Sequence, residues 1–196
     1  MGDILRRRGM MKAEGLSTII WRLASEKYFN GSTDFIDTGI KLCETDETYT
    51  IAIDFTNGSL SGAYTTLFYC IYESRPFPGI SFQRYESNNY YMLGGDGHSK
   101  NFSGIPTTSG KKIKFVLSRE KNTNKFNVFY TVDGGNYEKV SITGSCSTSN
   151  KNMLIGCYQT TNGTKGRYWN GTVHDFTIYN YAMTDEQAIS YVSGGM

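Results

Sequence analysis

Apolar residues alternate with polar ones along most of this 196-residue chain, and this period of two restricts its fold more than any other feature. The most regular example is the run 126–132, in which Phe126, Val128, Tyr130 and Val132 occupy every second position. Successive side chains of a β-strand point to opposite faces, so the run predicts a strand with one buried face. The same pattern predicts further strands in the ranges 48–56, 67–71, 80–82, 113–117, 153–157 and 173–179.

Turn signals separate these runs. Asn-Gly, Asp-Gly and Gly-Gly pairs, which tolerate positive φ at a chain reversal, occur at 57–58, 94–97, 133–136 and 162–163. Many short strands without intervening amphipathic helices predict an all-β fold, a two-sheet antiparallel sandwich or barrel. The one helix expected in the body covers 184–191, where Thr184 and Gln187 form a capping-box pattern.

Length and composition predict a single domain with its own core. Hydrophobic residues make up 38% of the chain and aromatic residues 14%, which is enough for a core. No apolar run reaches the roughly 18–20 residues of a membrane span, so we expect no membrane partner. The stretch 16–24 is interrupted by polar residues and lacks a cleavage site, which argues against secretory export. Cys43, Cys70, Cys146 and Cys157 show no C-x-x-C spacing, so we expect mostly buried thiols, with one disulfide left open.

The net charge of +2 is unevenly distributed. Residues 1–27 have a net charge of +3, so the rest of the chain sums to −1 and lacks the basic stripe of a nucleic-acid-binding body. We therefore expect a basic N-terminal arm (1–27), a sandwich domain (28–191) and a flexible tail (192–196). The residues leave two interpretations of the arm open, a frayed terminus or a docking segment for a larger assembly. Its candidate contacts are Arg6, Arg7, Arg8 and Lys12.

Both ends of the body carry motifs of one family. Residues 28–39 (Tyr-Phe-Asn-Gly-Ser-Thr-Asp-Phe-Ile-Asp-Thr-Gly) resemble the opening strand of laminin-G-like jelly-roll domains, in the concanavalin A-like lectin/glucanase superfamily. Residues 169–187 resemble the closing segment of that family, a strand followed by a sharp turn and a short helix. The resemblance covers 28–191 and implies a jelly-roll β-sandwich. The central hairpin departs from the family pattern, because it lacks the usual Trp-His pair before the strand around Phe115.

The closing segment also predicts a local irregularity. Val173 and Phe176 are three positions apart, whereas Phe176 and Ile178 are two apart. A β-bulge near residues 174–175 would place all three side chains in the core. Trp169 occupies a motif position that usually packs.

The superfamily includes hydrolases and binding modules, and the residues favour binding. Its glucanases carry both catalytic carboxyls in an E-x-D-x-E strand; residues 44–47 (Glu-Thr-Asp-Glu) break that spacing and precede a strand. His98 and His174 show no metal-ligand spacing, and no G-x-S-x-G nucleophile elbow is present. We therefore expect no enzyme.

We expect no cofactor either, and calcium alone stays open. Some laminin-G-like relatives bind calcium through loop oxygens, and this ion takes six to eight oxygen ligands. The available carboxylates are Asp34, Asp37, Asp96 and Asp133, which form no cluster in the sequence.

Aromatic and amide-bearing side chains are concentrated in residues 64–101, which favours a carbohydrate site there. Aromatic faces stack on sugars, while amides and carboxylates bind hydroxyl groups. On the strand at 80–82, Ser81, Gln83 and Tyr85 should point outward. The candidate carbohydrate-binding residues are Gln83, Tyr85, Asn89, Tyr90, Tyr91 and Asp96. The alternative is that the tyrosines simply cover a sandwich.

The arm suggests a setting for such a module. Residues 6–11 (Arg-Arg-Arg-Gly-Met-Met) resemble short tracts in structural proteins of gut bacteriophages and prophages. The resemblance implies a virion protein (head fibre, capsid decoration or tail-associated) assembled in the host cytoplasm, with other virion subunits and surface glycans as partners. A homo-oligomer is compatible with this setting. Two alternatives stay open: a purely structural protein that joins subunits, and a bacterial surface lectin or enzyme accessory domain.

Overall fold

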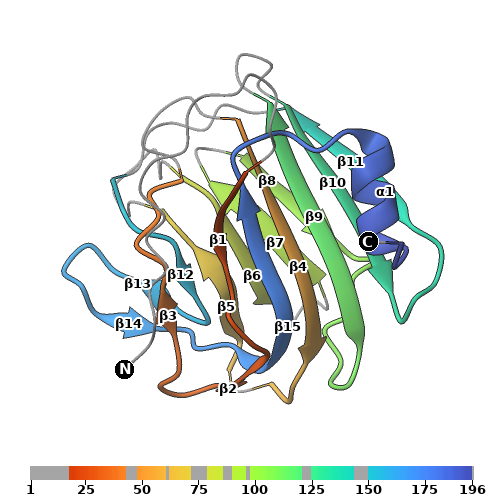
Figure 1. The fold of residues 1–196 in the computed structure, drawn as a ribbon. Coiled ribbons are helices and arrows are strands. Elements are labelled where there is room, and N and C mark those ends of the chain that lie inside the picture. The colour runs from red at the N-terminus through yellow and green to blue at the C-terminus, as the bar shows by residue number, and fades with distance from the viewer. Residues whose placement is uncertain are drawn as a thin grey trace.

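In the computed structural model, two antiparallel sheets face each other across one core (Figure 1). The structure describes residues 18–42, 48–60, 62–71, 79–85, 90–95, 98–120, 125–143 and 150–195. Within these residues the fold is an all-β jelly-roll sandwich with one short helix, which confirms the predicted fold class.

The first sheet has seven strands in the order β1-β15-β4-β9-β10-β11, with β2 also paired to β15. Its strands are β1 (Ile19–Arg22), β2 (Lys27–Asn30), β4 (Tyr49–Asn57), β9 (Lys112–Glu120), β10 (Lys125–Val132), β11 (Glu138–Thr143) and β15 (Asn170–Tyr179). The central strands β4, β9 and β10 are those with the clearest apolar alternation.

The second sheet has six strands in the order β3-β12-β5-β6-β7-β8. Its strands are β3 (Ile36–Asp37), β5 (Tyr64–Tyr69), β6 (Ser81–Tyr85), β7 (Tyr90–Gly95), β8 (His98–Phe102) and β12 (Leu154–Ile155). A separate two-stranded hairpin, β13 (Tyr158–Gln159) and β14 (Lys165–Gly166), lies beside β3, β12 and β5 (Figure 1).

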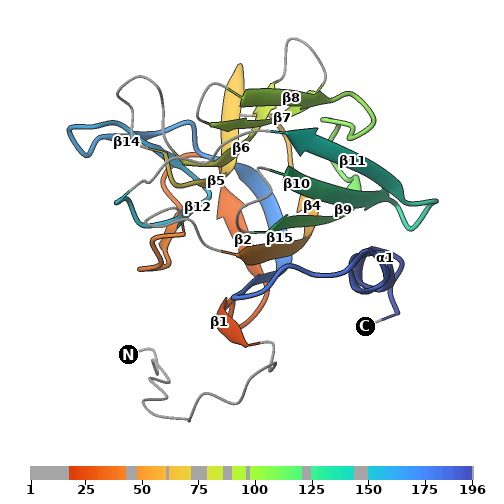
Figure 2. The same cartoon turned by 90° about the horizontal axis from the view of Figure 1, so that it is seen from above.

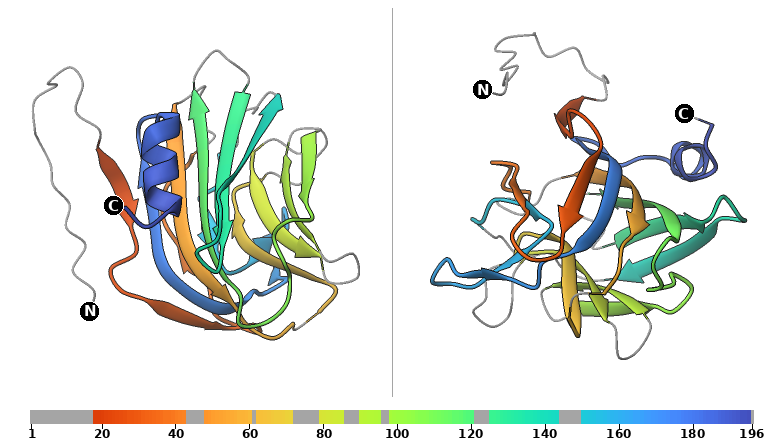
Figure 3. Two further views of the ribbon diagram at one scale, coloured as in Figure 1. Left: turned by 90° about the vertical axis from the view of Figure 1, so that its right-hand side faces the viewer. Right: turned by 90° about the horizontal axis from the view of Figure 1, so that it is seen from below.

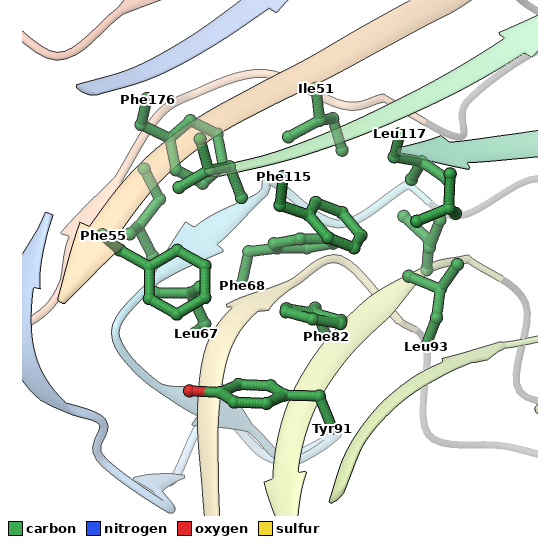
Figure 4. Close-up of a cluster of buried hydrophobic side chains, with 14 of the residues drawn as sticks. Ile51, Phe55, Leu67, Phe68, Phe82, Tyr91, Leu93, Phe115, Leu117 and Phe176 are labelled. Carbon is green, nitrogen blue, oxygen red and sulfur yellow. The ribbon is translucent and has the colours of Figure 1, made fainter. Parts of the chain in front are cut away.

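Aromatic rings from both sheets fill the space between them (Figure 4). Phe82 of β6 lies at the centre, with its ring centroid 4.4 Å from that of Phe115 on β9 and 5.7 Å from that of Phe68 on β5. Phe68 also makes an edge contact with Phe176 of β15. Buried aromatic side chains contribute large apolar areas, so this cluster stabilises the packing of the two sheets against each other.

The closing strand β15 follows the predicted irregularity. Its register with β4 shifts between Val173 and Asp175, which is the expected bulge, and Val173, Phe176 and Ile178 are all buried in the core. Trp169 is buried as predicted.

Helix α1 (Asp185–Val192) covers part of the outer face of the seven-stranded sheet (Figures 2 and 3). The Thr184 hydroxyl accepts from the Gln187 backbone N–H, and the Gln187 side chain accepts from the Thr184 backbone N–H, so the predicted capping box is present. Ala188 and Val192 pack on the sheet, where Thr131 donates a hydrogen bond to the Val192 carbonyl. Within the described residues, no helix has the length and apolarity to cross a membrane.

The seven-stranded sheet begins inside the segment predicted as an arm. Strand β1 pairs with the end of β15, and the Trp21 ring lies edge-on to Phe176 with centroids 5.9 Å apart. The contact joins two apolar side chains that are more than 150 positions apart in the sequence. The sheet therefore starts at residue 19 and not at the predicted boundary of residue 28, whereas Arg6, Arg7, Arg8 and Lys12 lie outside the described residues.

The described cysteines are buried thiols, as the sequence predicts. Cys70 lies next to β5 and Cys157 next to β13. Burial raises the pKa of the Cys157 thiol to about 12, so this group stays protonated at neutral pH. Cys43 and Cys146 lie outside the described residues.

Candidate functional site

Tyrosine side chains line up across three strands on the outer face of the six-stranded sheet. Register pairs Tyr64 of β5 with Tyr85 of β6, and Tyr85 with Tyr90 of β7. Residues directly opposite on antiparallel strands share a face, so the three rings lie in one row. Tyr64 is 43% exposed, and Tyr85 and Tyr90 are partly exposed.

The rings of this row are in contact. Tyr85 and Tyr90 are stacked, with centroids 5.2 Å apart and planes 21° apart. Tyr64 meets Tyr85 edge-on at 4.6 Å. Burial raises the pKa of the Tyr85 phenol, an effect that nearby Arg167 partly offsets, so the hydroxyl is a neutral donor and acceptor at physiological pH. We call Tyr64, Tyr85, Tyr90 and Arg167 the tyrosine surface.

A long excursion between β12 and β15 completes this surface. Residues 156–169, here called the flap, leave the sheet at Gly156 and return at Trp169, whose N–H donates to the Gly156 carbonyl at 2.9 Å. Gly156 has φ +86, and a Cβ there would lie 2.4 Å from the Phe29 ring, so both backbone and space require glycine. The base of the flap is thereby fixed against the core.

The flap places Arg167 beside the tyrosines. Its guanidinium lies over the rings of Tyr158 and Tyr64, with its central carbon 4.5 and 5.6 Å from the two centroids. Its Nη1 donates to the Gln83 Oε1 at 3.2 Å. The Arg167 backbone has φ 49, a left-handed conformation that is costly for a residue with a Cβ.

A pocket of about 420 Å³ opens at this surface. Tyr64, Thr65, Arg167 and Tyr168 form one part of its lining, and the chain at 31–32 and 62–63 forms the rest. The site therefore combines aromatic faces, phenolic hydroxyls and a cation around a hollow, which is the composition of a small-molecule binding site.

The structure brings together three of the predicted carbohydrate-binding residues. Tyr85 and Tyr90 lie on the surface, and Gln83 lies beneath Arg167 on the same face of the sheet. Ser81, Gln83 and Tyr85 do share the outward face as predicted, but the Gln83 side chain is only 6% exposed. Gln83 therefore supports the surface from below.

Tyr91 does not belong to this set. Its side chain points to the opposite face and is fully buried in the core, stacked on Phe82 with centroids 4.8 Å apart (Figure 4). Its hydroxyl donates to Asn57 Oδ1. A buried ring with a satisfied hydroxyl has no access to a ligand at the surface. Asn89 and Asp96 lie outside the described residues.

Arg167 is the residue that sequence reasoning missed. It follows Gly166 in a turn-rich segment where no periodicity marks a role, and its contacts with Tyr64 and Gln83 are long-range. Arg84, a second described arginine near this surface, lies on the inner face and donates to the backbone carbonyls of Gly58 and Thr107. Arg84 is therefore a core residue, and Arg167 is the one available to a ligand.

The described histidine side chain, His174, belongs to a polar link between strands. Its Nε2 lies 2.8 Å from Thr56 Oγ1, and its Nδ1 is hydrogen-bonded to Glu26. These contacts tie the β1–β2 connection to the bulge of β15.

Within the described ranges, no three His, Cys, Asp or Glu side chains gather as metal ligands. Asp133 is engaged by Lys111 at 2.7 Å, which lowers the Asp133 pKa, and Asp34 and Asp37 accept backbone N–H groups.

Comparison with solved structures identifies the fold. The chain is similar to the CBM40 domain of a Ruminococcus gnavus sialidase bound to α2,6-sialyllactose, with 12% identity, a TM-score of 0.67 and coverage of 89% of this chain and 100% of that one. A leech intramolecular trans-sialidase aligns at 10% identity and a TM-score of 0.62, over 89% of this chain and 28% of that one. A Trypanosoma rangeli sialidase mutant with trans-sialidase activity aligns at 15% identity and a TM-score of 0.63, over 91% and 30%.

These similarities define a class of fold. The chain has a jelly-roll β-sandwich fold similar to that of these sialidase CBM40 domains. No protein-family model and no curated protein matches the sequence. The finer resemblance to laminin-G-like domains therefore stays a prediction.

Proposed function

We propose that this chain is a non-catalytic carbohydrate-binding module and that the tyrosine surface is its glycan site. The observation that carries the proposal is the contact row of Tyr64, Tyr85 and Tyr90 beside the exposed guanidinium of Arg167, at the rim of a pocket. Structures with this fold include isolated carbohydrate-binding modules, which supports the assignment.

The chemistry of the surface suits a sugar. A pyranose ring presents apolar C–H groups on its faces and hydroxyl groups around its edge. Tyrosine offers an apolar ring for the first and a hydroxyl for the second, and its two χ angles lose little conformational entropy on binding. Ring contacts hold Tyr85 between Tyr64 and Tyr90, so the platform is formed before the ligand arrives.

Sialylated oligosaccharides are the first ligands to test. Two of the similar structures, both of the Ruminococcus gnavus CBM40 domain, are complexes with sialyllactose. A glycan array that includes sialylated, uronic-acid and neutral oligosaccharides should return binders, and Tyr85→Ala and Tyr90→Ala should each weaken binding at least about tenfold.

The matched control is Tyr137→Ala. Tyr137 is 46% exposed and lies in the β10–β11 connection of the other sheet. The Tyr137→Ala substitution should leave glycan binding unchanged. Equal losses in all three variants, or an array without binders, would refute the proposal.

We further propose that the module serves attachment within a larger assembly, a bacteriophage virion in particular. The support is the tract at residues 6–11 and the net charge of +3 over residues 1–27. A full-length chain should copurify with particles in a host that produces them, and a chain lacking residues 1–17 should not. Incorporation of both forms would refute a docking role for the N-terminal segment, and absence of both forms from particles would favour a bacterial surface lectin or an enzyme accessory domain.

A further inference from the structure

Among the described residues, the groups that hold Arg167 are neutral. They are the Gln83 carbonyl oxygen and the faces of the Tyr64 and Tyr158 rings. No Asp or Glu among the described residues forms an ion pair with it. By contrast, Arg22 on the other sheet is paired with Asp175 at 3.1 Å. No carboxylate of the described residues therefore compensates the positive charge of Arg167 at the tyrosine surface.

A buried relay fixes the orientation of the group that holds Arg167. The Ser81 hydroxyl donates to the Gly94 carbonyl at 3.4 Å, so its oxygen accepts from the Gln83 amide nitrogen at 3.0 Å. That bond places the Gln83 amide nitrogen toward Ser81 and turns the carbonyl oxygen toward Arg167. Both relay side chains are almost completely buried, at 0% for Ser81 and 6% for Gln83, so few alternative arrangements are open to them.

The backbone holds the arginine from the other side. The Thr66 N–H donates to the Arg167 carbonyl at 2.8 Å, and Thr66 forms a parallel bridge with Tyr168. These contacts keep Arg167 in its left-handed conformation. A strained backbone of this kind persists only where its surroundings determine it, and such residues gather at ligand sites.

The result is a preset fork of hydrogen-bond donors. A guanidinium has five N–H donors, and the Gln83 carbonyl takes one of them. The remaining donors are in the geometry that matches a carboxylate, whose charge would also compensate that of Arg167. A neutral sugar offers hydroxyl groups as hydrogen-bond acceptors, but it has no negative charge to compensate that of Arg167.

We propose that Arg167, oriented by the Ser81–Gln83 relay, binds the carboxylate of an acidic sugar, so that the tyrosine surface selects carboxylated over neutral glycans. This inference rests on the proposed glycan-binding function. Sialic acids and uronic acids share the required carboxylate. Gln83 is the positioning residue, and Arg167 is the residue that touches the ligand.

The decisive variant is Gln83→Glu. It keeps a hydrogen-bond acceptor beside Arg167 and strengthens that tether, so the flap stays in place. The second carboxylate oxygen replaces the amide donor to Ser81, so the Ser81 hydroxyl turns from the Gly94 carbonyl and donates to Glu instead. The substitution also supplies a carboxylate inside the protein, which compensates the charge that an acidic ligand would otherwise meet. If Arg167 had only a structural role, this change would leave glycan binding as it is. If Arg167 binds the carboxylate of the ligand, this change removes the preference for carboxylated glycans.

Isothermal titration calorimetry provides the test, with 3′-sialyllactose, 6′-sialyllactose, trigalacturonic acid and, as the neutral counterpart, lactose. Wild type should bind at least one carboxylated probe about tenfold or more tightly than lactose. Gln83→Glu and Arg167→Ala should each remove that preference, and Arg22→Ala should retain it. The class of probe that binds, sialylated or uronic, identifies the source of the carboxylate.

Two failures are distinguishable. If lactose and the carboxylated probes bind equally, or if Gln83→Glu retains the preference while remaining folded by circular dichroism, acid selection by Arg167 is wrong and the glycan-binding function stands. If a broad glycan array shows no ligand, the proposed function fails, and this inference fails with it.

Discussion

Tyr90 and Tyr91 are adjacent in the sequence and lie on opposite faces of the six-stranded sheet. Tyr90 stacks on Tyr85 at the surface, and Tyr91 stacks on Phe82 in the core. One strand thus contributes both to the candidate ligand site and to the aromatic cluster that holds the two sheets together. Rigidity of the site follows from this arrangement, because the strand that carries Tyr90 is fixed by its neighbour.

The two tyrosines should respond differently to truncation. Tyr91→Ala removes a fully buried ring and should lower the free energy of unfolding by about 3–5 kcal/mol, as for other buried aromatic residues. Tyr90→Ala should cost less than about 1 kcal/mol, since its ring is partly exposed. Urea denaturation of both variants checks this, and equal losses would place Tyr91 outside the core.

Alkaline pH should weaken the fold through Tyr91. Burial raises its pKa from 10.0 to about 12, so the folded state retains the phenolic proton after the unfolded state has lost it. Stability therefore falls as pH rises from about 10 to 12, by up to about 3 kcal/mol for this group.

Other phenols with raised pKa values contribute to the same trend, Tyr191 and Tyr179 among them. The specific measurement is therefore the difference between wild type and Tyr91→Phe. Tyr91→Phe should lose some stability at neutral pH, because Asn57 loses its donor, and should show a shallower decline above pH 10. Identical slopes would rule out ionisation of Tyr91 as a cause.

The start of the sheet at residue 19 predicts which N-terminal changes matter. Removal of residues 1–17 retains every described contact of β1, including the bond from the Thr18 N–H to Asn180 Oδ1, and should leave the thermal midpoint nearly unchanged. Trp21→Ala removes the contact with Phe176 and should cost about 1–3 kcal/mol. A large loss on deletion of 1–17 would contradict this boundary.

Backbone strain at Arg167 predicts a difference between two variants. Arg167→Ala loses the guanidinium contacts and keeps the costly positive φ, whereas Arg167→Gly loses the same contacts and relieves that cost. The glycine variant should be more stable by about 1–2 kcal/mol, while both lose the preference for acidic glycans. Equal thermal stability would show that φ 49 carries no strain.

Local patterns predicted the fold well because they reflect short-range physics. Alternation located the central strands, the Thr184–Gln187 pair located the helix, and the spacing of Val173, Phe176 and Ile178 located the bulge. Each of these signals lies within a few residues of the feature that it predicts.

The site was harder to predict because its contacts join distant segments. Tyr90 and Tyr91 are chemically identical, and only the pairing of Tyr85 with Tyr90 decides which of them faces outward. Arg167 reaches Gln83 across 84 positions, through the flap that connects β12 to β15. The strand at 19–22 is short and mostly exposed, so its apolar alternation is weak. Its contacts, the pairing with β15 and the packing of Trp21 on Phe176, involve residues that are distant in the sequence.

The most direct measurement is the position of the bound glycan on the protein. Amide chemical shifts of ¹⁵N-labelled protein, recorded during titration with the strongest array ligand, should change most at Tyr64, Tyr85, Tyr90 and Arg167. Shifts concentrated instead on the seven-stranded sheet, or near Tyr137, would contradict a glycan site at the tyrosine surface.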